Sequence, residues 1–205
     1  MGFGCLFIGY FFANMMPPVG SPLSVLKLIG YPLVVAALYR LAPYHKRFLY
    51  CFFVSLATLP FALYYGMFGL SSFGVFPAYA FLSGTFYNVV QIVYLTVSLA
   101  VHLLLLLAVA GLGAELKLSQ IRANAWRNLT FVGAYFLLRV LMLLPVPALQ
   151  RLIGPTLLIW ICMIFLNLFL LFRCYRYICP EGDEDMPDRQ PVKPTSRRSE
   201  DGDES

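Results

Sequence analysis

A group of polar residues recurs at helical spacing in a stretch that is otherwise apolar. The group consists of Asn88, Gln91, Ser98 and His102. Their separations of three, seven and four residues place them on one face of a helix with about 3.6 residues per turn. Amide, hydroxyl and imidazole groups can hold a polar or anionic ligand through hydrogen bonds. The pattern therefore predicts a polar lining for a ligand or a path, or else hydrogen bonds between helices, which are common in membrane bundles.

Arg139 is the second candidate for chemistry. It lies in the apolar run FLLRVLMLLP, residues 136–145, and we predict that it lies near the middle of a membrane span. A central arginine costs about 2.5–3.5 kcal/mol on the insertion scale, and no predicted span contains an acidic partner for it. We expect either an arginine that reaches the interface or caps carbonyls, or a site for an anion or a lipid headgroup. In the second case the residues around the anion would be Arg139, His102, Ser98, Gln91 and Asn88.

The composition indicates which elements must position these residues. Of the 205 residues, 60% are hydrophobic and 12% are charged, and the mean hydropathy is +0.76. Soluble domains carry about 45–50% apolar and about 25% charged residues. We therefore expect an all-α integral membrane bundle over residues 1–180. Residues 181–205 hold nine of the ten acidic residues and no aromatic residue, so we predict a disordered acidic tail.

Six segments are candidates for membrane spans, since a helix needs about 20 apolar residues to cross a bilayer core of about 30 Å. They are Gly2–Met16, Val25–Leu41, Phe48–Phe68, Tyr87–Leu112, Leu129–Val146 and Pro155–Tyr177. The first is short and the second contains Pro32, so the alternative is five spans plus a re-entrant N-terminal segment. Two further faces should pack inside the bundle: Cys51, Ser55, Thr58, Ala62 and Gly66 on the third segment, and Thr156, Trp160, Met163, Asn167 and Cys174 on the sixth.

Basic residues alternate between the predicted loops. The loops RLAPYHKR and GAELKLSQIRANAWRN hold three Lys or Arg each and the last flank holds two, whereas the intervening loops hold zero, zero and one. Because positive loops remain in the cytoplasm, the pattern predicts a cell-membrane protein with both termini cytoplasmic. The segment AELKLSQIRANAWRN is either an ordinary positive loop or an amphipathic helix at the membrane surface. In the second case the contacts to anionic lipid would come from Lys117, Arg122, Trp126 and Arg127.

The sequence lacks the patterns that favour an enzyme or an ion-coupled carrier. No Asp or Glu lies in a predicted span, so coupled transport has no membrane carboxylate to use. Zinc-peptidase, serine-hydrolase, phosphate-loop and paired-cysteine motifs are missing. The five cysteines are scattered and are interpreted as packing residues. We expect no catalytic residue, no metal, no cofactor and no nucleic-acid partner.

Three stretches, MGFGCLFIGYFF, LIGYPLVVAALYRLAPY and CPEGDEDMP, resemble uncharacterised multi-pass membrane proteins of clostridia-like bacteria. This resemblance implies a bacterial inner membrane and no particular activity. The sequence thus favours a non-enzymatic multi-pass protein that acts as a subunit or binding partner in a membrane complex. Its expected partners are the lipid bilayer, including anionic lipid, and other membrane subunits. The alternative is a small facilitator or exporter for a neutral or anionic amphiphile, with a polar bundle interior.

Overall fold

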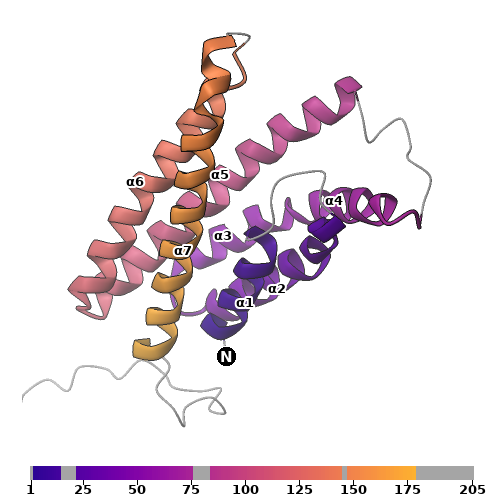
Figure 1. Ribbon diagram of the computed structural model, residues 1–205. Coiled ribbons are helices and arrows are strands. Elements are labelled where there is room, and N and C mark those ends of the chain that lie inside the picture. The colour runs from indigo at the N-terminus through magenta and orange to yellow at the C-terminus, as the bar shows by residue number, and fades with distance from the viewer. Residues whose placement is uncertain (1, 15–21, 76–83, 145–146, 179–205) are drawn as a thin grey trace, which may run out of the picture.

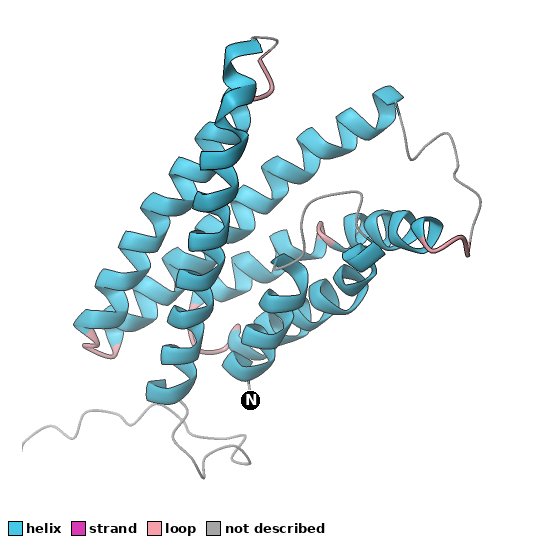
Figure 2. Ribbon diagram, viewed as in Figure 1, coloured by secondary structure: helices cyan, strands magenta, loops and turns pink. Residues whose placement is uncertain are grey.

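The computed structural model describes residues 2–14, 22–75, 84–144 and 147–178, and within these ranges every regular element is a helix (Figures 1 and 2). The predicted all-α class is confirmed. The predicted tail, residues 181–205, lies outside the described residues. The α-helices are α1 (Gly2–Asn14), α2 (Lys27–Leu41), α3 (Lys46–Leu56), α4 (Leu59–Ser72), α5 (Gly84–Glu115), α6 (Ser119–Leu141) and α7 (Ile153–Ile178), with short 3-10 turns η1 (Pro22–Leu26) before α2 and η3 (Pro147–Leu152) before α7.

Fewer helices than predicted are long and apolar enough to cross a bilayer. Among the described residues three qualify, Leu23–Leu41, Phe86–Glu115 and Ile153–Ile178, and α3 with α4 adds a fourth if the two form one bent span. The prediction of six spans is therefore not supported. α1 is too short, because its 13 residues rise only about 20 Å. α6 has 23 residues, but it begins in polar sequence and carries Arg122, Arg127 and Arg139.

The predicted third span, Phe48–Phe68, is broken in the structure. α3 ends at Leu56, α4 begins at Leu59, and the helices are bent by 43° at the break. Pro60 in the first turn of α4 explains the break, because proline has no N–H for the helical ladder and its ring clashes with the preceding turn. The small-residue face is confirmed nevertheless, since all five of its residues, Cys51, Ser55, Thr58, Ala62 and Gly66, are buried.

α1 and α2 form a close antiparallel pair (Figure 1). A β carbon on Gly9 would lie 2.8 Å from the backbone nitrogen of Val34, and one on Gly30 would lie 2.4 Å from that of Ala13. Glycine at these two positions lets the helix backbones approach, as small residues do in membrane bundles. This pairing places the last turn of α1 beside the first turn of α2.

The basic segments gather at one end of the bundle, which we call the basic end. His45 lies 3.6 Å from Glu115, and Arg173 donates a hydrogen bond to Gln120 at 2.8 Å. Figure 1 shows the start of α1, the α5–α6 turn and the end of α7 at this same end. The segments that the sequence assigned to one side of the membrane therefore lie on one side of the fold.

The segment AELKLSQIRANAWRN forms neither a separate helix nor an ordinary loop, because it is divided between the end of α5 and the start of α6. α5 continues to Glu115, a turn follows in which Lys117 has a φ of 56°, and α6 begins at Ser119. Within it Ile121 and Ala125 are buried, whereas the predicted membrane-surface residues Lys117, Arg122, Trp126 and Arg127 are exposed. Contact between these four residues and anionic lipid stays a prediction.

Candidate functional site

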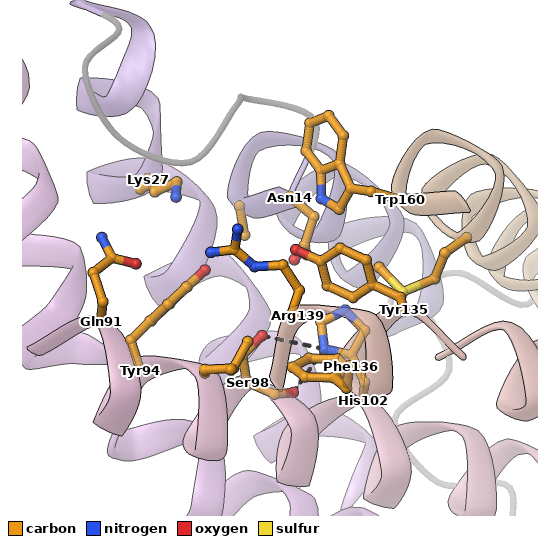
Figure 3. A pocket seen from close by; sticks show the side chains of 13 residues that line it. Asn14, Lys27, Gln91, Tyr94, Ser98, His102, Tyr135, Phe136, Arg139 and Trp160 are labelled. Atoms are coloured by element: carbon orange, nitrogen blue, oxygen red, sulfur yellow. Dashed lines mark hydrogen bonds between the residues drawn. The ribbon is translucent and has the colours of Figure 1, made fainter. Parts of the chain in front are cut away.

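The candidate site is a small pocket lined by residues of α1, α2, α5, α6 and α7 (Figure 3). Its volume of about 40 Å³ is room for about three water molecules. Two of its residues are cations, Lys27 and Arg139, and we call it the cation pocket. Its other side chains with polar groups are Asn14, Gln91, Tyr94, Ser98, His102, Tyr135 and Trp160.

The structure brings together four of the five residues that the sequence predicted for the site. Gln91, Ser98, His102 and Arg139 all line the cation pocket. Asn88 does not line it and is exposed, so a part for Asn88 in binding stays a prediction. The physical reason is that the first turns of α5 extend past the neighbouring helices (Figure 1), so that Phe86 and Val89 are exposed there as well.

Arg139 lies in the last turn of α6, which corrects its predicted position near the middle of a span. α6 begins ten residues before the predicted start at Leu129 and ends at Leu141, before the predicted end at Val146. Arg139 is therefore about 30 Å from the start of its helix. A cation in the last turn interacts favourably with the helix dipole. Its Nε is nonetheless buried and has no hydrogen-bond partner among the described residues.

Lys27 is the functional residue that the sequence analysis missed. Its side chain is only 2% exposed, and its Nζ lies 4.4 Å from the centre of the Tyr65 ring and 5.4 Å from that of Tyr94. Arg139 is close enough to interact electrostatically with the same Tyr65. Cation–π contacts stabilise a buried ammonium group but do not neutralise it. The signal in the sequence was a single lysine inside an apolar segment.

The pocket offers hydrogen-bond donors and positive charge. Besides Arg139 Nε, the Nε2 of Gln91 is buried and meets no acceptor in hydrogen-bond geometry within the described residues, although the Gln91 side chain interacts with that of Tyr87. A buried donor without an acceptor costs about 1–3 kcal/mol. Figure 3 shows the ends of Lys27, Arg139 and Tyr94 directed toward the same space, with Gln91 beside them. An anion in this space would supply the missing acceptors.

A chain of hydrogen bonds joins the wall of the pocket to the core of the bundle, and we call it the polar chain. Its members are Ser98, His102, Tyr10, Asn167 and Asn128. His102 Nδ1 lies 2.7 Å from the Ser98 carbonyl and Nε2 lies 3.0 Å from the Tyr10 hydroxyl. Asn167 Nδ2 donates to that hydroxyl at 2.8 Å, and Asn128 Nδ2 donates to Asn167 Oδ1 at 3.1 Å. The chain therefore connects α5, α1, α7 and α6.

With a neutral His102, each bond of the polar chain has one direction. Asn128 Nδ2 also lies 2.9 Å from the Leu166 carbonyl, and a carbonyl can only accept, so the Asn128 amide orientation is fixed. The Ser98 carbonyl likewise requires a proton on His102 Nδ1. In the neutral imidazole with this proton, Nε2 accepts the proton of the Tyr10 hydroxyl, whose oxygen accepts in turn from Asn167. The arrangement thus fits the neutral His102 tautomer protonated at Nδ1.

Comparison of the chain with protein-family models, with curated proteins and with solved structures finds no match. The cation pocket and the polar chain must accordingly be interpreted from their own geometry.

Proposed function

We propose that this chain is a multi-pass membrane protein that binds the anionic head of an amphiphile in the cation pocket, as a small facilitator or exporter would. The observation that carries the proposal is the pairing of Lys27 from α2 with Arg139 from α6 on one small pocket. No acidic side chain lines this pocket among the described residues. Two like charges in a medium of low dielectric raise the free energy of an empty site, and an anion between them lowers it.

The position of the pocket suits an amphiphile. Counted along α5, His102 is 13 residues from Glu115 at the basic end, and Gln91 is 24 residues from it. These separations correspond to about 20 and about 36 Å, so the pocket lies in the half of the bundle that is remote from the basic end. Tyr135, Arg139 and Trp160 are only partly buried. A headgroup could enter beside them while its acyl chains remain in the bilayer.

Replacing Arg139 or Lys27 by an uncharged residue should abolish most of the binding of an anionic amphiphile. We expect Arg139→Gln and Lys27→Met each to weaken the binding of an anionic amphiphile about ten- to hundredfold, because each removes a charge-assisted contact. Native mass spectrometry in detergent, with phosphatidic acid, phosphatidylglycerol and oleate added separately, measures this. Arg151→Gln is the matched control, since Arg151 is exposed and lies outside the pocket lining. Equal binding by all three variants and the wild type for every probe would reject the proposal.

The expectation of a subunit in a membrane complex rests on the class of protein and stays a prediction. Cross-linking in native membranes followed by co-purification tests it: a stoichiometric protein partner would favour the subunit, and lipid movement by the purified chain in vesicles would favour the facilitator.

We also propose that the basic end faces the cytoplasm of a bacterial cell, because three of the basic segments lie there and such segments are retained inside. In a variant without the native cysteines, Ser72→Cys should react with a membrane-impermeant thiol reagent in intact cells. Ser119→Cys should react only after the cells are broken, because it lies in the first turn of α6 at the basic end. Both positions are exposed. The reverse pattern of labelling would invert the orientation.

A further inference from the structure

We infer that the group bound in the cation pocket is a phosphate with at least three terminal oxygens, either the phosphomonoester head of a lipid or free phosphate, in preference to a carboxylate or a phosphodiester. This inference rests on the proposed function, because it names the ligand of the same site. It depends on three properties of the pocket: charge, number of donors and size.

The first property is charge. Lys27 and Arg139 supply two positive charges, and the last turns of α1 and α6 contribute about half a negative charge each through their helix dipoles. At least one positive charge is left without compensation. A carboxylate or phosphodiester carries one negative charge, whereas a phosphomonoester carries about 1.5 to 2 near pH 7. Each of these anions would neutralise part of the remaining positive charge. The charge of the pocket therefore favours an anion but does not distinguish among these three.

The second property is the number and direction of the donors. Lys27, Gln91 and Arg139 come from three different helices, α2, α5 and α6, and line the same small space (Figure 3). The arginine offers a planar fork, and the lysine ammonium offers three further protons. Three terminal phosphate oxygens provide an acceptor for each of the three residues. A carboxylate offers about four acceptor sites on two oxygens, but these sites lie in one plane and match donors from three helices less well.

The third property is size. The pocket volume of about 40 Å³ is room for about three water molecules, which is about the space of three phosphate oxygens. Lys27, which is 2% exposed, closes one side of this space. A phosphodiester carries a substituent on both sides of phosphorus and therefore needs two exits from the pocket. A phosphomonoester needs one exit, and the fourth oxygen of free phosphate would take the same exit.

The test compares ligands of matched chain composition on the full-length protein in detergent. We expect phosphatidic acid to bind at least about tenfold more tightly than phosphatidylglycerol or oleate, as measured by native mass spectrometry and by the ligand-induced rise in Tm. This preference should disappear in Arg139→Gln and in Lys27→Met and persist in Arg151→Gln. Far-ultraviolet circular dichroism and the Tm without ligand establish that each variant is folded.

Inorganic phosphate distinguishes the two sources of the group. Displacement of phosphatidic acid from the wild-type protein by millimolar phosphate would indicate that the free ion occupies the site. Binding of phosphatidic acid without such displacement would indicate a lipid head. Equal binding of phosphatidic acid and phosphatidylglycerol, still dependent on Lys27 and Arg139, would overturn the phosphate inference and leave the proposed function standing. Binding that is independent of both cations for every probe would overturn both.

Discussion

Gly30→Ala is expected to destabilise the protein by about 1–3 kcal/mol, in the range of overpacked cores, whereas Gly133→Ala is expected to stabilise it by about 0.5–1 kcal/mol. Both glycines lie inside helices, α2 and α6 respectively. The substitution is the same, so the difference measures the space around each residue. Thermal unfolding in detergent, followed by circular dichroism, gives the sign of each effect.

The two effects on stability differ because the new methyl group would contact different atoms at each position. At Gly30 it would lie 2.4 Å from the backbone nitrogen of Ala13, 2.8 Å from the Ala13 Cα and 2.8 Å from the carbonyl carbon of Phe12. These are backbone atoms of α1, and they cannot move unless α1 and α2 separate. At Gly133, apart from its chain neighbours and the backbone of its own helix, no atom of the described residues lies within 4 Å. A methyl group there only improves helix propensity.

Gly30→Ala should also change the shape of the cation pocket, because Ala13 and Asn14 line that pocket. We expect Gly30→Ala to weaken anion binding although it removes no charge. Gly133→Ala should leave binding unchanged. A Gly30→Ala variant with the stability of the wild type would show that the two helices are not packed as closely as the structure has them.

Much of the fold could be predicted from local sequence, because apolar periodicity and charge patterning act over a few turns. The polar face of α5 was predicted at Gln91, Ser98 and His102, and so was the buried face of α7. The helix boundaries were predicted less well. Pro60 breaks an apolar run that hydropathy treats as continuous, and α6 extends into polar sequence because Ile121 and Ala125 have a buried place to pack.

The pairings in the site could not be predicted, because they join residues that are far apart in the chain. Tyr10 and Asn167 are 157 positions apart, and Tyr10 and His102 are 92 apart. Hydropathy gives the face of each helix but not its neighbour. The same holds for Lys27, because the two aromatic rings that contact its ammonium group, Tyr65 and Tyr94, lie on other helices.

Tyr10→Phe is expected to destabilise the protein by about 1–3 kcal/mol, because it removes one oxygen that makes two buried hydrogen bonds. Interhelical hydrogen bonds in membranes are worth about 0.6 kcal/mol on average and up to about 1.7, and each buried partner left unpaired adds to this loss. Those partners are His102 Nε2 and Asn167 Nδ2. Tyr39→Phe is the control, since Tyr39 is 66% exposed.

The donor and acceptor roles in the polar chain allow a double-mutant test of the Tyr10–Asn167 hydrogen bond. Tyr10 must donate to His102 and accept from Asn167, so Tyr10→Phe and Asn167→Leu remove the same bond. Their effects on the free energy of unfolding should therefore be less than additive, with a coupling of about 0.5–3 kcal/mol. Tyr10→Phe and Gly133→Ala share no contact and should add. Additive losses for Tyr10→Phe and Asn167→Leu would mean that the two side chains are not bonded, and the polar chain from the pocket would then end at Tyr10.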